Sequence, residues 1–161
     1  MAMTAQQFAA LIDEYSAVLV LSARSWCATP EDAVQDAFCR LAAQRTPPDD
    51  PAAWLFTAVK NAAVDRGRSE SRRKRREQIA ARPQAWFYEP AVDNLDAEAA
   101  VAALESLPVE LREAIIARLW GGLTFEQIAA AYGCSLTTAH RRYEAGIAAL
   151  REALGEPCPT T

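Results

Sequence analysis

The sequence lacks any long hydrophobic run, and this absence removes two classes of protein. The longest apolar stretch, residues 17–21, is far shorter than the roughly 18 residues needed to cross a membrane. The first seven residues also lack the basic start and the small-residue cleavage site of a secretory signal peptide. We therefore expect a cytoplasmic protein with no membrane insertion.

Motifs for metal binding or covalent chemistry are also missing. The four cysteines form no Cys-x-x-Cys pair, and no residue three or four positions after the single histidine, His140, completes a metal site. No phosphate-binding loop or nucleophile motif is present. These absences predict reduced cysteines that pack in the protein, no cofactor, and a protein that is not an enzyme.

One short segment carries more than half of the positive charge of an acidic chain. The whole chain has 17 basic and 21 acidic residues, for a net charge of −4, whereas residues 60–82 hold 9 basic and 3 acidic residues. Residues 83–103 hold no basic residue and 4 acidic ones. Because like charges repel, the basic segment needs either solvent or an anionic partner. A solvated helix, or a nuclear-localisation signal at residues 72–76, are the alternatives.

Apolar residues recur at helical spacing throughout, and no segment alternates as a strand would. We predict an all-α fold of two small helical domains joined by a linker: residues 1–82, a linker with the start of the next helix at 83–103, and residues 104–161. The expected helices cover residues 5–27, 30–44, 51 to 68 or as far as 81, 96–107, 109–120, 125–132 and 136–154. The aromatics at 86–88 either dock on a neighbouring surface or belong to a mobile tether.

Capping residues mark several of these helix ends. Thr29 and Asp50 each precede a proline that suits the first turn of a helix. Thr124 with Gln127 forms a capping box, and Gly133 stops the short helix that follows it. On the first helix, the expected buried stripe consists of Phe8, Leu11, Ile12 and Tyr15.

The strongest local motif is a helix-turn-helix over residues 124–154. Its turn contains Gly133, Ser135 caps the second helix, and Gly146 lowers the helical propensity of that helix by ~1 kcal/mol. One stripe of the second helix is expected to be buried: Leu136, Ala139, Tyr143, Ile147, Leu150 and Leu154. The residues beside or opposite that stripe lie near the N-terminal end, where recognition helices meet DNA: Thr137, Thr138, His140, Arg141 and Arg142. A helical hairpin with no DNA-binding role is the alternative.

Three segments together resemble the extracytoplasmic-function (ECF) group of bacterial RNA polymerase sigma factors, within the sigma-70 family. Residues 30–38, PEDAVQDAF, resemble the family's helix that grips the polymerase clamp. Residues 50–68, DPAAWLFTAVKNAAVDRGR, resemble the helix that melts and reads the promoter −10 element. Residues 104–142 resemble the −35 helix-turn-helix, including the lead-in Leu-Pro and the Gly-Leu-Thr. The resemblance spans roughly residues 5–155, in the family's order.

The resemblance implies three sets of site residues. The clamp of core RNA polymerase is expected to contact Asp32, Gln35, Asp36 and Arg40. The melted −10 strand is expected to contact Lys60, Asn61, Asp65, Arg66, Arg68, Arg72 and Arg73, with Asn61 and the loop at 46–50 holding an unstacked base. The duplex −35 element is expected to contact Ser135, Thr137, Thr138, His140, Arg141 and Arg142. Because many members of this group are held by an anti-sigma partner, such a partner is also compatible with the sequence.

Two other functions are weighed against a sigma factor. A stand-alone helix-turn-helix regulator would be a dimer and would bind duplex DNA without polymerase. It leaves the acidic helix and the asparagine-bearing basic helix of the first half unexplained. A structural or adaptor helical protein is opposed only by the concentrated basic segment.

Overall fold

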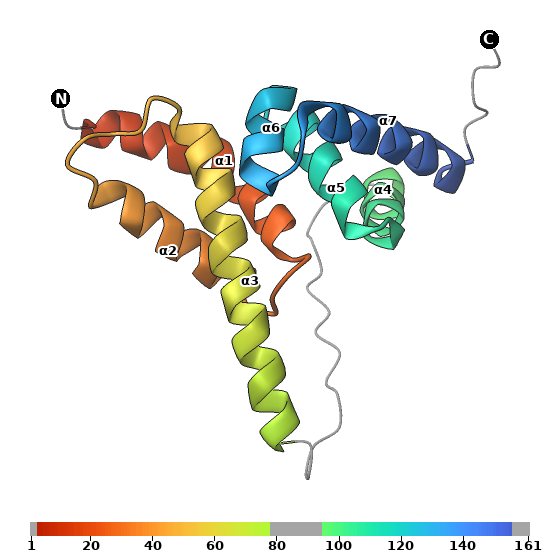
Figure 1. Cartoon of the computed structure of the whole chain (residues 1–161), viewed down its shortest axis with the longest axis horizontal. Helices are drawn as coiled ribbons and strands as arrows, with labels where there is room; N and C mark the ends of the chain where they lie inside the picture. Colours follow the sequence, from red (N-terminus) through yellow and green to blue (C-terminus); the bar gives the residue numbers. More distant parts are fainter. Residues whose placement is uncertain (1–2, 78–94, 156–161) are drawn as a thin grey trace.

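The computed structural model describes residues 3–77 and 95–155, and within these residues the protein is entirely helical, without a strand (Figure 1). The predicted all-α class is confirmed. The aromatics at 86–88 lie outside the described residues. The helices are α1 (Ala5–Ala23), α2 (Pro30–Ala42), α3 (Pro51–Glu77), α4 (Leu95–Ser106), α5 (Val109–Ile115), the π-helix η1 (Ile116–Trp120), α6 (Phe125–Tyr132) and α7 (Leu136–Ala153).

The first three helices pack on one another within an apolar core that continues into the later helices, and we refer to α1–α3 as the first domain. The core side chains of α2 and α3 recur at helical spacing on one face of each helix, including Ala33, Ala37, Leu41, Leu55, Val59 and Ala62. Asp50 begins α3 as expected, because its Oδ1 accepts a hydrogen bond from the backbone N–H of Ala53 at 2.9 Å. Glu70, far along α3, accepts one from the backbone N–H of Ala28 at 3.1 Å and so ties the α1–α2 loop to α3.

Three expectations for this domain are wrong. The helix expected over residues 5–27 ends at Ala23, because the chain turns there and the backbone N–H of Trp26 donates to the carbonyl of Ala23. Thr29 makes no side-chain capping bond, so α2 begins at Pro30 without one. Ile12 is 37% exposed, since the buried face of α1 turns toward Val18 and Leu19 instead.

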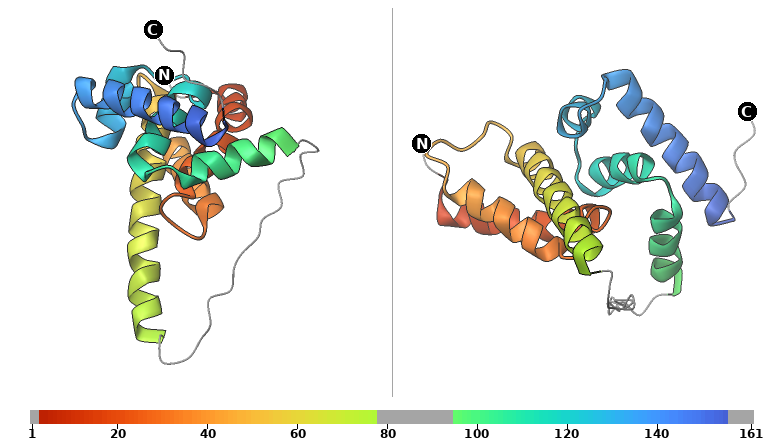
Figure 2. Two further views of the ribbon diagram at one scale, coloured as in Figure 1. Left: turned by 90° about the vertical axis from the view of Figure 1, so that its right-hand side faces the viewer. Right: turned by 60° about the horizontal axis from the view of Figure 1, so that its bottom comes forward.

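Helix α3 runs straight through Gly67, although glycine has low helix propensity. Figure 2 shows α3 as a long arm whose C-terminal part reaches beyond the rest of the molecule. A Cβ atom at Gly67 would lie 2.0 Å from the backbone oxygen of Trp26. The glycine is therefore needed because the α1–α2 loop crosses α3 at this point.

The remaining helices, α4 to η1 with α6 and α7, form the second domain. The Thr124–Gln127 capping box, the left-handed Gly133 with φ of +63° and the Ser135 cap are all present, as predicted. Two members of the expected buried stripe are wrong, because Leu136 is 48% exposed and Leu154 is 42% exposed at the two ends of α7. The middle of the stripe holds, with Ala139 fully buried and Ile147 and Leu150 packed against the core.

Gly146 has a packing role in the second domain. It is buried, and a Cβ atom there would lie 2.8 Å from Cδ1 of Ile115 on α5. Glycine thus lets α5 and α7 approach closely.

The two domains lie directly against each other, with α6 on α3 and η1 on the end of α1 (Figures 1 and 2). Phe56 of α3 is 1% exposed, and a Cβ atom at Gly121 would lie 2.5 Å from its ring. The turn after η1 therefore covers Phe56. We call this arrangement the closed form.

Candidate functional site

The side chains expected to bind the polymerase clamp lie on one face of α2. Asp32, Gln35 and Arg40 are exposed, whereas Asp36 is half-buried. Asp36 accepts a hydrogen bond from Nη2 of Arg66 on α3 at 2.5 Å, and Asp32 lies 3.7 Å from Nη1 of the same residue. The hydrogen bond to Asp36 raises the pKa of Arg66. Asp36 therefore pairs across two helices and not with Arg40 one turn along α2.

The side chains expected to bind the melted −10 strand divide into two groups. Asn61, Asp65, Arg68, Arg72 and Arg73 are exposed along α3. Lys60 and Arg66, in contrast, are engaged by other parts of the protein. The exposed group leads into the basic end of α3, where Lys74, Arg75 and Arg76 occupy its last turn.

Lys60 is enclosed by the second domain. Its Nζ lies 3.2 Å from Oε1 of Glu113 on α5 and only 4.6 Å from the ring centroid of Tyr132 on α6. On its other side, the ring of Trp26 is centred 5.2 Å away. The Lys60 side chain is 20% exposed and that of Glu113 is 2% exposed. The cation is thus held by one carboxylate and two aromatic faces.

Glu113 has a second partner in the first domain. Nε1 of Trp26 donates a hydrogen bond to its Oε1 at 2.7 Å. Burial raises the pKa of Glu113, while the charge of Lys60 and the Trp26 hydrogen bond act in the opposite direction. Both of these partners of the buried carboxylate, Trp26 and Lys60, belong to the other domain.

Two further contacts join the domains. Gln127 on α6 donates a hydrogen bond to Asp50, the residue that caps α3, and its Oε1 also accepts from the backbone N–H of Thr124 at 2.6 Å. Arg112 on α5 donates to Oγ of Ser25 at 3.2 Å. The capping box of the helix-turn-helix is therefore connected to the start of α3.

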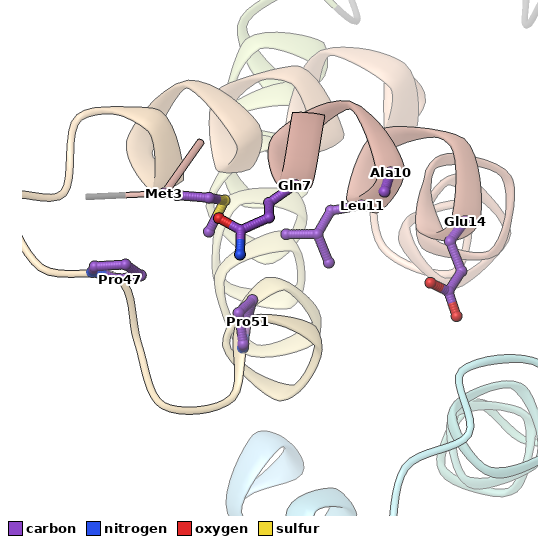
Figure 3. A pocket seen from close by; sticks show the side chains of 7 residues that line it. All are labelled: Met3, Gln7, Ala10, Leu11, Glu14, Pro47 and Pro51. Carbon is purple, nitrogen blue, oxygen red and sulfur yellow. The ribbon is translucent and has the colours of Figure 1, made fainter. Parts of the chain in front are cut away.

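A hollow lies beside the loop that precedes α3. It is lined by one face of α1, by the loop and by the first residue of α3, as Figure 3 shows: Met3, Gln7, Ala10, Leu11, Glu14, Pro47 and Pro51. Asn61 follows Pro51 by ten helical residues, or about 15 Å of helix rise. That Asn61 and the loop hold one unstacked base together stays a prediction.

The side chains expected to meet the −35 duplex lie on the first turns of α7, and most of them face solvent. Thr137, His140 and Arg141 are exposed, while Thr138 and Arg142 are half-buried. Ser135 is exposed, but its Oγ accepts from the backbone N–H of Thr138 at 3.1 Å, so its first task is to cap the helix. The ring of His140 packs at 4.7 Å from Phe125, and its Nδ1 lies 3.5 Å from Glu144.

Sequence reasoning missed Trp26 and Glu113. The signal for Glu113 was present, because it is a charged residue four positions after Val109 and three before Ile116, on an otherwise apolar face of α5. No comparable signal marked Trp26, since its importance comes from a partner 87 residues away.

Two family models match the chain. The model of Sigma-70 region 2 matches residues 11–73, and that of Sigma-70, region 4 matches residues 97–150. The first covers α2 and most of α1 and α3, and the second covers the helix-turn-helix and the helices before it. Together the two models match well over half of the chain, which therefore belongs to the sigma-70 family.

Named relatives agree with this assignment. The chain is 34% identical over 113 residues to the ECF RNA polymerase sigma factor SigK of Mycobacterium sp. strain KMS. The aligned segment covers 65% of this chain and 57% of that protein. It is 36% identical over 110 residues to SigK of Mycolicibacterium vanbaalenii, covering 63% and 55%. The matched segment thus spans little more than half the length of these relatives.

Two solved structures share the fold. The sigma factor RpoE of Bartonella quintana, solved in complex with the anti-sigma factor NepR, superposes with a TM-score of 0.73 at 24% identity and covers 94% of this chain and 98% of that one. CnrH, solved with the cytosolic domain of CnrY, gives a TM-score of 0.58 at 24% identity, covering 94% and 90%. Among the residues described for this protein, no helix combines the length and apolar character that crossing a membrane requires.

Proposed function

We propose that this protein is an RNA polymerase sigma factor that directs the core enzyme to specific promoters and initiates transcription. The observation that carries the proposal is the presence of regions 2 and 4 of the sigma-70 family on one chain, in that order. A stand-alone dimeric regulator would need only the second of them.

In this proposal, the exposed face of α2 binds the clamp of core polymerase. Asp32 and Gln35 present a carboxylate and an amide to solvent, and Arg40 lies on the same helix. Such a face suits a basic helical partner. Asp36 contributes as well, but its pairing with Arg66 also anchors α2 to α3.

The melted −10 strand binds along α3, and the duplex −35 element binds α7. An exposed amide, Asn61, can hold an unstacked base, and Arg68, Arg72 and Arg73 follow it with positive charge for the backbone. On α7, Thr137 and Arg141 are free to approach base edges and phosphates.

In this proposal the protein carries out no covalent chemistry itself, because polymerase catalyses RNA synthesis. We place its work in the cytoplasm, together with core polymerase and promoter DNA. The RpoE and CnrH structures each contain a further protein, NepR or a domain of CnrY. We propose an anti-sigma protein of this kind as a third class of partner.

The test is co-elution of the purified protein with bacterial core RNA polymerase on a sizing column, compared between two charge-reversal variants. Asp32→Arg changes the proposed clamp face, and Asp13→Arg makes the same change at an exposed position of α1. We expect wild type and Asp13→Arg to co-elute and Asp32→Arg to elute alone. Circular dichroism of both variants checks that their helices are intact.

Two results would count against the proposal. If the wild type does not co-elute with core polymerase but binds duplex DNA as a dimer, the stand-alone regulator is the better description. If Asp32→Arg co-elutes as well as Asp13→Arg does, the clamp face is not on this part of α2.

A further inference from the structure

Trp26 and Lys60 form a two-donor site for one anion. Trp26 lies in the loop between α1 and α2, and Lys60 lies on α3. Nε1 of Trp26 is 2.7 Å from Oε1 of Glu113, and Nζ of Lys60 is 3.2 Å from the same oxygen and 3.3 Å from Oε2. Two segments of the first domain thus converge on a single carboxylate supplied by the second domain.

The same two donors suit a phosphate of DNA. Phosphate oxygens are bound by ammonium groups and N–H donors through charge-assisted hydrogen bonds, as the carboxylate is here. Next to this site, a shallow hollow continues along α3, lined by Trp26, Val64, Gly67, Arg68, Ser71 and Arg72. A strand whose phosphate lay on Lys60 would therefore meet two further cations along its path.

The closed form cannot be the form bound to a promoter. The names of the −35 and −10 elements give their promoter positions, which are about 25 base pairs apart. That separation is ~85 Å of duplex at ~3.4 Å per pair. In the closed form, α6 of the helix-turn-helix packs on α3, and Gln127 touches the cap of α3. The domains must separate before both elements can be bound, and separation takes Glu113 away from Lys60 and Trp26.

We propose that Glu113 occupies, in the closed form, the position that a phosphate of single-stranded DNA takes on Lys60 and Trp26 once the domains part. Closure thus blocks the −10 strand through competition for the same two donors. This inference rests on the proposed function for the identity of the strand, but the site itself binds any single-stranded backbone. It adds Trp26 to the residues that contact DNA.

The test measures binding of a short fluorescent oligo(dT) to the purified chain without polymerase. Glu113→Ala removes the internal carboxylate, and Glu110→Ala removes an exposed carboxylate three residues earlier on the same helix. We expect Glu113→Ala to bind about tenfold more tightly than wild type, the size of one charge-assisted hydrogen bond. Glu110→Ala is expected to bind as wild type does, within the small effect of one surface charge.

Two further variants test the donors themselves. In the Glu113→Ala background, Lys60→Ala should remove the gain and lower the slope of log affinity against log salt by about 0.7, the value for one phosphate contact on a single strand. Trp26→Phe keeps the ring and loses the N–H, so it should remove part of the gain. Unchanged circular dichroism shows that the variants are folded.

The inference is overturned if Glu113→Ala binds oligo(dT) no better than Glu110→Ala, or if the gain survives Lys60→Ala. These measurements contain no polymerase, so they are independent of the co-elution test. A protein that fails to bind core polymerase and still shows the Glu113 effect would refute the sigma-factor function and leave the competition between Glu113 and phosphate standing.

Discussion

The two faces expected to bind DNA differ in the closed form. On α7, Thr137, His140 and Arg141 point to solvent. On α3, Lys60 is enclosed by Glu113 and two aromatic rings, and Arg66 is paired with Asp36. One domain keeps its proposed duplex-reading surface open, while the other has two of its proposed strand-binding cations, Lys60 and Arg66, occupied.

The difference follows from which faces the domains use to pack. The second domain contacts the first mainly through η1, α6 and the Glu113 side of α5, while Thr137, His140 and Arg141 on the first turns of α7 stay exposed. We therefore expect the closed form to bind a duplex −35 site without rearrangement and to bind a melted −10 strand only after opening.

The largest expected effect comes from removing the ring that lies between the domains. Phe56→Ala deletes a side chain that is 1% exposed and covered by Gly121, so we expect the free energy of unfolding to fall by about 3–5 kcal/mol in urea titrations. The radius of gyration from solution X-ray scattering should rise, because closure loses its central contact.

Phe8→Ala is the matched control for that variant. Phe8 is a partly buried phenylalanine on α1, and its ring packs against Phe38, 5.9 Å away within the first domain. Phe8→Ala should therefore destabilise the first domain without separating it from the second domain. If Phe56→Ala lowers the free energy of unfolding but keeps the wild-type radius of gyration, the ring stabilises the first domain alone. That result would contradict a role for Phe56 in holding the two domains together.

The next effect is the difference in stability loss between alanine substitutions at Gly67 and Gly146, which have different neighbours. Gly67→Ala places a methyl group 2.0 Å from the backbone oxygen of Trp26, so the strand-binding side must distort, at a cost of about 1–3 kcal/mol. Gly146→Ala meets the side chain of Ile115 at 2.8 Å and the backbone oxygen of Leu111 at 3.2 Å, but it gains up to ~1 kcal/mol of helix propensity, so its net loss should be smaller than that of Gly67→Ala. Thermal unfolding followed by circular dichroism compares the two, and equal losses would contradict the account of Gly67.

A smaller effect is expected from removing the N-terminal cap of α7, the helix with the exposed proposed duplex-binding face. Ser135→Ala removes the hydroxyl that accepts from the N–H of Thr138 at the start of α7, which should cost about 1 kcal/mol of unfolding free energy. Thr29→Ala changes a similar residue that makes no capping bond, so it should cost close to nothing. If Thr29→Ala lowers the unfolding free energy as much as Ser135→Ala does, the capping hydrogen bond of Ser135 does not account for the loss.

The smallest expected effect is the pH dependence of closure. Burial raises the pKa of Glu113, against the opposing influence of Lys60 on α3 and Arg142 on α7. Burial is the largest of these influences, so an open form that exposes Glu113 to water has the lower pKa. On that premise the closed form binds a proton more tightly, and closure gains stability as pH falls through the raised pKa and loses it as pH rises. Scattering measured from neutral to mildly acidic pH should show the molecule becoming more compact, and Glu113→Gln should remove the trend. Expansion on acidification would reverse the sign and sink this assignment.

Local chemistry made most of the helices predictable. Proline at the start of α2 and α3, the Thr124–Gln127 box and Gly133 act on their own neighbours, so their effect can be deduced from spacing alone. Thr29 shows the limit, since a capping residue type in the right position makes no capping bond. The surfaces expected from the family resemblance fall on α2, α3 and α7, and their roles stay predictions.

Contacts between distant segments were not predictable in the same way. Phe56 is buried because Gly121 covers its ring, and Gly67 is required because the Trp26 backbone crosses α3 at that point. Gly146 likewise lies against Ile115, 31 positions earlier. Each depends on how two helices approach in space, and a single sequence carries no periodic signal of that approach.

The shared use of Lys60 has a consequence for thermodynamic linkage. If only the open form binds the strand, the apparent affinity equals the intrinsic affinity multiplied by the fraction of molecules that are open. Any ligand that favours the open form then raises strand affinity by a fixed factor, and the strand raises the affinity of that ligand by the same factor. A carboxylate held between a lysine and a tryptophan would in this way make the protein nearly inert toward stray single strands and responsive to them only in the presence of a second ligand.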